Sequence, residues 1–148
     1  MSEPEERPGP QDAIAYYDRG VSRYNQGQYE LATQDFHEAV RLDPTYALAY
    51  YRRSLSRTAL GQSEQAVQDL DEAIRLDPTF ARAYFGRGRL RQQLGQDEQA
   101  IQDFDEAIRL DPQDPRAYRN RGRIHQLLGN SKEAERDFQK AKELGYIP

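Results

Sequence analysis

The chain contains no cysteine, which excludes disulfide bonds and thiolate metal sites and makes a reducing compartment suitable for it. It also has no long apolar segment. A membrane-spanning helix needs about 20 mostly apolar residues, and no uninterrupted run approaches that length. The first residues are acidic and lack the apolar stretch of a signal peptide. These absences predict a soluble, cytoplasmic protein.

Patterns typical of catalytic, metal or cofactor sites are missing as well. The two histidines, His37 and His125, are far apart in the sequence and form no helical metal-binding pair. No glycine-rich phosphate loop and no nucleophile–base arrangement occurs. Asp103, Asp105 and Glu106 form an acidic cluster, but they follow helical periodicity and lack the glycine-containing loop of a calcium site. We therefore expect no enzymatic activity, no metal and no cofactor.

Apolar residues are scarce, at 36% of the chain against 31% charged residues, which in an irregular sequence would suggest disorder. We expect disorder only for residues 1–12, an acidic tail with several prolines. From residue 13 onward the sequence repeats with a period of 34 residues. The segment Gly95–Pro112 returns as Gly61–Pro78 with three changes in eighteen positions, and looser copies begin at Gly27 and Gly129. Such a period is typical of stacked units that bury their apolar faces against their neighbours.

Each repeat reads as two helices joined by a short turn. The four repeats occupy residues 13–46, 47–80, 81–114 and 115–148. Glycines interrupt the helical pattern at positions 27, 61, 95 and 129, and prolines follow the second helix at positions 44, 78 and 112. Ser63, Asp97 and Ser131 stand where they could cap the second helix, a role that Tyr29 cannot fill. No part of the chain shows the alternation of a strand.

The repeat resembles the tetratricopeptide repeat, a helical hairpin of 34 residues. The resemblance covers residues 13–146 and rests on large residues in the first helix, small residues where the helices approach, and alanines in the second helix. These residues are Tyr16, Tyr50, Tyr84 and Tyr118, then Gly20, Ser54, Gly88 and Gly122, and alanines at positions 32, 66, 100 and 134 and at 39, 73, 107 and 141. The resemblance implies an all-α fold, a right-handed superhelical solenoid of four antiparallel helix-turn-helix repeats.

The chain departs from the family pattern at the seventh position of the repeat. Leucine is usual there in the family, but this chain has Arg19, Arg53, Arg87 and Arg121. Sixteen residues after each arginine stands an aspartate, at Asp35, Asp69, Asp103 and Asp137. Two interpretations are open. Either the charges lie on separate solvated faces, or each pair ties the two helices of its hairpin together, with a geometry that can be bidentate.

The end repeats carry polar residues at positions that are apolar in other repeats. Ser22 and Gln26 stand at such positions in the first repeat, and Glu135 and Lys142 in the last. Polar outer faces on the end units keep a finite array soluble, and Gly145 can end the last helix. We therefore expect the array to be complete at four repeats.

Charge is divided unevenly between the two helices of each repeat. The first fourteen residues of the four repeats together hold thirteen arginines and a single acidic residue, Asp18, although the net charge of the chain is −4. In the family the first helices line a concave groove, so the resemblance implies a basic groove inside an acidic shell. The residues expected to line it are Tyr17, Val21, Tyr24, Tyr51, Arg52, Leu55, Arg82, Phe85, Arg89, Arg116, Arg119, Asn120 and Arg123.

These groove residues are mainly apolar and aromatic in the first two repeats and rich in arginine in the last two. Arginine binds carboxylates through its planar fork of donors, and aromatic and arginine side chains are enriched at binding hot spots. We therefore predict a non-catalytic adaptor or scaffold module that binds an acidic peptide with apolar anchors. The simpler interpretation is that the aromatic residues pack against neighbouring helices and the arginines are merely solvated.

The main alternative function is a self-assembling homo-oligomeric scaffold, in which the basic groove of one copy contacts the acidic back of another. The adaptor would instead be a monomer or a weak oligomer. Nucleic-acid binding is disfavoured, because the net charge is negative and the flanking carboxylates repel phosphates. Some family members hold the acidic C-termini of heat-shock chaperones with lysines and asparagines. That partner is disfavoured here, since the matching positions are Tyr17, Val21, Arg52, Arg82 and Gly86.

Overall fold

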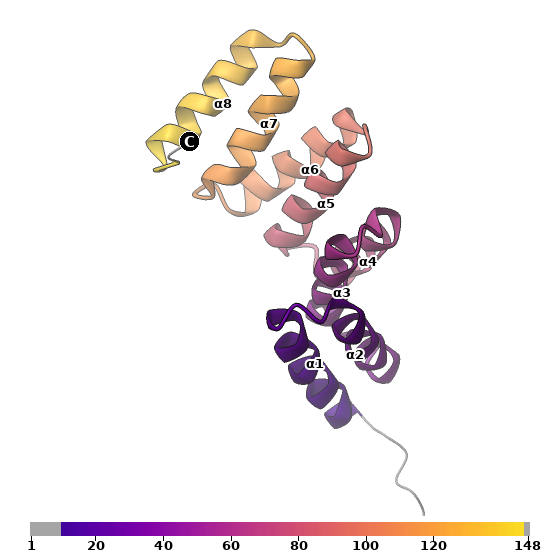
Figure 1. The fold of residues 1–148 in the computed structure, drawn as a ribbon. Coiled ribbons are helices and arrows are strands. Elements are labelled where there is room, and N and C mark those ends of the chain that lie inside the picture. The colour runs from indigo at the N-terminus through magenta and orange to yellow at the C-terminus, as the bar shows by residue number, and fades with distance from the viewer. Residues whose placement is uncertain (1–9, 147–148) are drawn as a thin grey trace, which may run out of the picture. The chain divides into compact units, whose positions relative to one another are not determined.

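The computed structural model describes residues 10–146, and every regular element in that range is an α-helix. The helices form antiparallel hairpins, as the repeat period predicts (Figure 1). They are α1 (Pro10–Asn25), α2 (Tyr29–Leu42), α3 (Ala47–Ala59), α4 (Ser63–Leu76), α5 (Ala81–Gln93), α6 (Asp97–Leu110), α7 (Pro115–Leu127) and α8 (Ser131–Glu143). The predicted all-α helical repeat solenoid is thereby confirmed. Within residues 10–146, no helix combines the length and the apolar character needed to cross a membrane.

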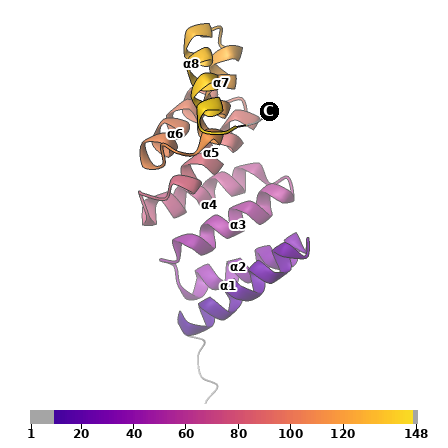
Figure 2. The same ribbon diagram turned by 90° about the vertical axis from the view of Figure 1, so that its left-hand side faces the viewer.

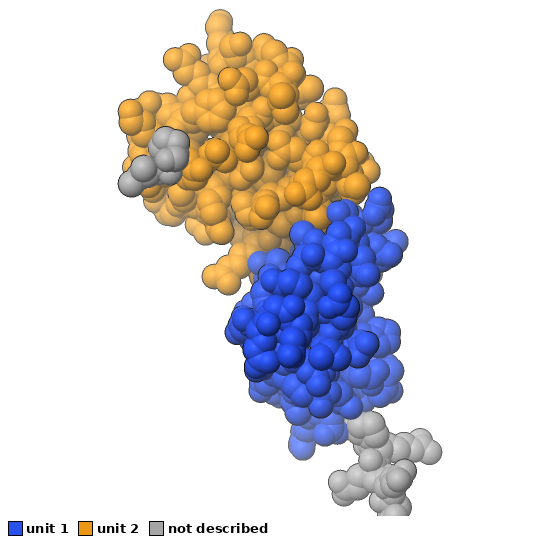
Figure 3. Space-filling view, in the orientation of Figure 1, with its two compact units in different colours: residues 1–76 blue, residues 77–148 orange. Residues whose placement is uncertain are grey.

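The chain divides into two compact units, residues 1–76 with α1 to α4 and residues 77–148 with α5 to α8 (Figure 3). In unit 1 each helix packs on the next, so that α1 to α4 lie side by side (Figure 2). Unit 2 repeats this order of contacts from α5 to α8. The first helices of the two hairpins within each unit also touch: α1 touches α3 in unit 1, and α5 touches α7 in unit 2. The predicted groove residues therefore fall into two sets, one in each unit.

Glycine makes the turn inside each hairpin possible. The turn glycines have φ between +74° and +79°, a left-handed conformation that strains other residues. They are Gly27, Gly61, Gly95 and Gly129. The second helices of the first three hairpins end two residues before a proline, as expected, and Gly145 after α8 also has a left-handed conformation. Turn and helix ends thus follow the sequence signals.

The predicted capping residues of the second helices are wrong. Ser63, Asp97 and Ser131 are the first helical residues of α4, α6 and α8, and so they lie inside the helix. The glycine turn closes one residue earlier than expected, so Gln96 takes the cap position of α6 without a side-chain capping hydrogen bond. Asp97 instead lies in the first turn of α6, where a carboxylate stabilises the positive end of the helix dipole.

The predicted boundary of the N-terminal tail also shifts. α1 begins at Pro10, so residues 10–12, which were expected to be disordered, are helical. Proline suits the first position of a helix because its φ is already helical and the missing N–H has no partner there. Asp12 adds a favourable charge in the first turn. Residues 1–9, the rest of the predicted tail, lie outside the described residues.

The hairpins are closely packed because the small residue of the first helix matches the large residue of the second. Three hairpins place a glycine against a phenylalanine ring: Gly20–Phe36, Gly88–Phe104 and Gly122–Phe138. A Cβ atom on Gly20 would lie 2.7 Å from Cε1 of Phe36, which is too close for any unshifted structure. In the second hairpin Ser54 stands in place of glycine and Leu70 in place of phenylalanine, and both are buried. Serine adds volume on α3, and leucine, which is smaller than phenylalanine, removes volume on α4.

The recurring aspartates are buried, and each is bound by the arginine sixteen residues before it. The ion pairs are Arg19–Asp35, Arg53–Asp69, Arg87–Asp103 and Arg121–Asp137. In the third hairpin Asp103 is 2% exposed, and Arg87 donates to it from Nη2 at 2.7 Å and from Nε at 3.1 Å. The guanidinium of Arg87 also lies over the ring of Tyr84, 5.6 Å from its centre. The interpretation of these pairs as ties within each hairpin is confirmed, and that of separate solvated charges is wrong.

A second arginine, one helical turn further on, binds the same aspartate in three hairpins. These residues are Arg23, Arg57 and Arg91. Arg91 donates from Nη1 to Oδ2 of Asp103 at 2.9 Å, so that carboxylate faces two guanidinium groups. The fourth hairpin has His125 at this position. Hydrogen bonding to Asp137 raises the pKa of Arg121 above its ordinary value, which keeps that tie charged.

Two of these arginines also reach the preceding hairpin of their own unit. Arg121 donates from Nη1 to Oδ1 of Asp105 on α6 at 2.7 Å. At the corresponding place in unit 1, Nη1 of Arg53 lies 3.2 Å from Nδ1 of His37 on α2. The contact of Arg53 lacks the charge assistance of an ion pair, because an imidazole ring carries no negative charge and a carboxylate does.

The His37→Asp variant should therefore be more stable than the wild type. A carboxylate at this position can form with Arg53 the ion pair that Asp105 forms with Arg121, which should add about 0.5–1 kcal/mol to the free energy of unfolding. Urea denaturation followed by circular dichroism at low and high salt measures the change. His37→Asn, which removes the ring without adding charge, is the control. A stability of His37→Asp at or below that of His37→Asn would contradict the expected pairing.

Candidate functional site

In unit 1 the predicted groove residues Tyr17 and Arg52 lie next to each other. The half-buried ring of Tyr17 packs 5.0 Å from the ring of Tyr46 and 5.8 Å from that of Phe36, measured between ring centres. Arg52 donates from Nε to the Tyr17 hydroxyl at 3.3 Å, which links α3 to α1. Burial raises the pKa of Tyr46, so its hydroxyl stays neutral. This side of unit 1 is an aromatic surface with one arginine at its edge.

The other predicted residues of unit 1 are less closely grouped. Val21, Tyr51 and Leu55 are half-buried. Tyr24 packs edge-on against Tyr29 of α2, with ring centres 5.3 Å apart, and so belongs to the end of the first hairpin. Tyr46 was missed from the sequence because it precedes α3, although an aromatic residue at the same place in the next repeat, Phe80, was a usable signal.

The thirteen arginines of the first helices serve two different purposes. Seven of them are held by buried aspartates: Arg19, Arg23, Arg53, Arg57, Arg87, Arg91 and Arg121. The six that take no part in these ties are Arg52, Arg82, Arg89, Arg116, Arg119 and Arg123. Of these six, only Arg52 belongs to unit 1. The basic character predicted for the whole groove is therefore concentrated on unit 2.

On unit 2 the remaining arginines form a regular surface, which we call the arginine face. It consists of Arg82, Phe85 and Arg89 on α5 and of Arg116, Arg119 and Arg123 on α7. Spacings of three and seven residues place each set on one side of its helix, and the two sets correspond exactly one repeat apart. The guanidinium of Arg116 lies 4.9 Å from the centre of the Phe85 ring, so the two sides adjoin. The arginine face thus contains five arginines and one aromatic residue.

The end of the arginine face near the start of α7 is largely compensated by acidic residues. Asp114 caps α7 by accepting a hydrogen bond from the amide of Arg116, and its carboxylate also binds the Arg116 guanidinium at 2.7 Å. Hydrogen bonding to Arg116 lowers the pKa of Asp114, with a smaller contribution from the charge of Arg82. Beside this pair is a pocket of about 240 Å³, whose lining includes Phe85, Arg82 and Ala107. Its lining combines apolar side chains with charged ones, among them Asp111, Asp114 and Arg116.

The opposite end of the arginine face has no such compensation. Arg89 and Arg123 are exposed, and within residues 10–146 neither has a carboxylate at ion-pair distance. Arg119, one helical turn before Arg123 on α7, is half-buried and lies 4.8 Å from the centre of the Tyr146 ring. Tyr146, which was not predicted, is brought there by the turn after α8, where its amide donates to the carbonyl of Ala141. This end combines cationic and aromatic surface.

Asn120, the remaining predicted residue, has its side chain engaged within α7. Its Nδ2 donates to the carbonyl of Arg116 at 2.7 Å, and its amide oxygen takes no part in this hydrogen bond. Arginine nitrogens and one aromatic ring, rather than amide groups, therefore dominate the chemistry of the arginine face. Such a surface can hold carboxylates and an apolar side chain together.

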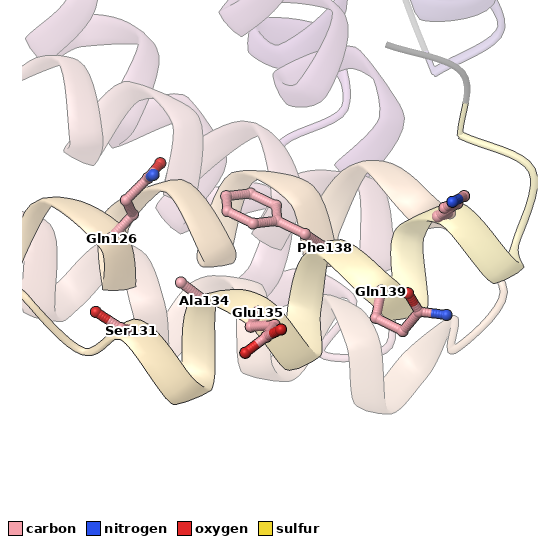
Figure 4. Close-up of a pocket in the computed structure, with 7 residues that line it drawn as sticks. Gln126, Ser131, Ala134, Glu135, Phe138 and Gln139 are labelled. Carbon is pink, nitrogen blue, oxygen red and sulfur yellow. The ribbon is translucent and has the colours of Figure 1, made fainter.

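The outer side of α8 forms a second hollow, of about 350 Å³ (Figure 4). Phe138 points from α8 toward α7, while Glu135 and Gln139 lie at the rim. One repeat earlier, the matching residues of α6 include Ile101 and Ile108, which pack against the core of unit 2. Glu135 and Lys142, exposed at the corresponding positions, confirm that the last repeat has a polar outer side.

Comparison with known families agrees with this architecture. The family model described as TPR repeat matches residues 55–95 and 88–129, and models described as tetratricopeptide repeat match residues 13–46 and 115–145. The fold and the site define an all-α helical repeat protein of the protein–protein interaction class. The chain belongs to the tetratricopeptide repeat family. No curated protein matches it.

Solved structures are similar over most of the chain. A crystal structure of MamA has a TM-score of 0.88 at 27% identity, covering 91% of this chain and 79% of that one. MamA from Desulfovibrio magneticus RS-1, from residue 41 to the end, has a TM-score of 0.83 at 26% identity, covering 89% and 75%. The first TPR of Spaghetti (RPAP3), bound to the HSP90 peptide SRMEEVD, has a TM-score of 0.79 at 25% identity, covering 81% and 95%.

Proposed function

We propose that this protein is a non-catalytic adaptor and that its arginine face binds an acidic peptide segment carrying an apolar anchor. The observation that carries the proposal is the concentration on unit 2 of five arginines that take no part in the buried ties. The anchor would enter the pocket above Phe85, and the acidic residues would pair with Arg89, Arg119 and Arg123. The lack of cysteine suits a cytoplasmic location for such an adaptor.

The relative bound to an HSP90 peptide supports the binding of an acidic peptide as the type of function, since that peptide is acidic at its end. It does not identify the partner of this chain. The family positions that hold such peptides are occupied here by Tyr17, Val21, Arg52, Arg82 and Gly86. In unit 1 Tyr17 is covered by Tyr46 and bound by Arg52, so it offers aromatic surface rather than an amide or ammonium donor. We therefore propose an acidic partner of different sequence.

Replacing Arg89, Arg119 and Arg123 together with glutamate should abolish peptide binding. Each exchange removes an attractive contact and adds a repulsive one, so the loss should reach about 100-fold or more. A labelled synthetic peptide with glutamates and one leucine, titrated by fluorescence anisotropy, measures the effect. Wild-type affinity should also fall as salt is added, because the pairs are exposed and screened.

A matched control replaces three arginines on the second helices of the hairpins. Arg41, Arg75 and Arg109 are exposed on α2, α4 and α6, where each pairs with a glutamate three residues earlier. Their replacement with glutamate alters the net charge equally and should leave peptide binding within about threefold of wild type. Equal losses in both triple variants would mean that net charge alone governs binding. The proposed function would be overturned if the wild type bound the glutamate peptide no more tightly than a version with glutamines in place of the glutamates.

A further inference from the structure

We propose that the partner segment crosses α5 and α7 in an extended, polyproline-like conformation and carries two acidic residues three positions apart, which pair with Arg89 and Arg123. This inference rests on the proposed function and adds the sequence spacing that the surface selects. It is drawn from the way the repeat places identical positions of neighbouring first helices beside each other.

The two ends of the arginine face differ in how far their charges are compensated. At one end Arg116 is held by Asp114, 2.7 Å away, and the same carboxylate attracts Arg82. A ligand carboxylate placed there would have to compete with Asp114. At the other end Arg89 and Arg123 are exposed, and in the described part of the chain neither forms an ion pair. The acidic groups of a ligand are therefore directed to Arg89 and Arg123.

The distance between Arg89 and Arg123 follows from the repeat. They occupy the same position of consecutive repeats, one on α5 and one on α7, and these helices are in contact. Packed helices have axes about 8–10 Å apart, so two side chains in the same register begin about that far apart. The contact of Arg116 with Phe85 shows that the faces of α5 and α7 adjoin on this side of the unit.

This separation matches one spacing of acidic residues in an extended ligand. A polyproline-like chain has three residues per turn and rises about 3.1 Å per residue, so acidic residues at i and i+3 lie on one side, about 9 Å apart. Neighbouring acidic residues, at i and i+1, point in different directions and begin only about 3–4 Å apart. Of these two spacings, i, i+3 is therefore the one that matches the separation of both arginines.

The test uses synthetic peptides of identical composition that differ only in the order of their residues. One carries two glutamates at i and i+3, another at i and i+1, and both contain one leucine. On the full chain, the i, i+3 peptide should bind about fivefold more tightly, the value of one additional exposed ion pair. In the Arg123→Gln variant this preference should disappear, because only Arg89 remains of the pair whose separation selects the i, i+3 spacing.

The Arg136→Gln variant is the matched control, since Arg136 is exposed on α8, outside the arginine face, and its replacement removes the same charge. It should keep the fivefold preference. If the wild type bound the two glutamate peptides equally tightly, and both more tightly than a version with glutamines, the proposed spacing would be overturned. The proposed function would then still stand. Binding of neither peptide would overturn the proposed function itself. Tighter binding of a short uridine oligonucleotide than of either peptide would overturn both.

Discussion

The Asp103→Ala variant should lose about 3–5 kcal/mol of its free energy of unfolding. Asp103 is 2% exposed and accepts hydrogen bonds from Arg87 and Arg91, whose side chains are only 15% and 18% exposed. Removing the carboxylate leaves two cations with little access to water and no counter-charge from this aspartate. Their repulsion and their lost hydration oppose folding together. Urea denaturation monitored by far-ultraviolet circular dichroism gives the change in free energy.

Asp105→Ala is the matched control for this prediction, because Asp105 stands two residues further along the same helix. It also binds an arginine, Arg121, at 2.7 Å, but its side chain is 52% exposed. Exposed ion pairs contribute about 1 kcal/mol or less, so Asp105→Ala should have a small effect. Asp137→Ala should fall between the two, since Asp137 is 5% exposed and His125 takes the place of the second arginine. Equal losses for the Asp103 and Asp105 variants would show that burial does not set the strength of these ties.

The hairpin ties illustrate how far the sequence could be interpreted. An arginine and an aspartate sixteen residues apart, repeated four times, predicted a contact between two helices, and the ion pairs confirm it. The second arginine, present in three of the four ties, was overlooked, although Arg23, Arg57 and Arg91 recur four residues after the first. That spacing is one helical turn, so both arginines lie on the same side of the helix. The signal was therefore present, and helical geometry alone would have found it.

The candidate site was less predictable, because its charge depends on side-chain partners. Counting arginines in the first helices suggested a basic groove through every repeat, whereas seven of the thirteen are held by buried aspartates. The neutralisation of Arg116 by Asp114 depends on the loop before α7, and the position of Tyr146 depends on the turn after α8. Loop and turn conformations do not follow the periodicity that made the helices predictable. Identical sequence positions thus acquire different electrostatic surroundings.

The Gly20→Ser variant should be destabilised by about 1–3 kcal/mol, the usual cost of adding atoms to a packed core. A Cβ atom at Gly20 would lie 2.7 Å from Cε1 and 2.9 Å from Cδ1 of Phe36, a ring that is fully buried. Unit 1 also contains the accommodated form of this change, because Ser54 is buried in the second hairpin with Leu70 in place of phenylalanine. The hydroxyl of Ser54 donates to the carbonyl of Tyr51 at 2.6 Å, so it is satisfied within its own helix.

Combining Gly20→Ser with Phe36→Leu should therefore cost less than the sum of the two single changes. Phe36→Leu alone opens a cavity and loses apolar burial, which should cost about 1–3 kcal/mol. In the double variant the serine side chain occupies part of the volume that the ring leaves, as Ser54 does beside Leu70. We expect a favourable coupling of about 1 kcal/mol or more, measured by a double-mutant cycle in urea. Strict additivity would mean that the hairpin relaxes around the serine, and that the matching of small and large residues across the four repeats is not a packing constraint.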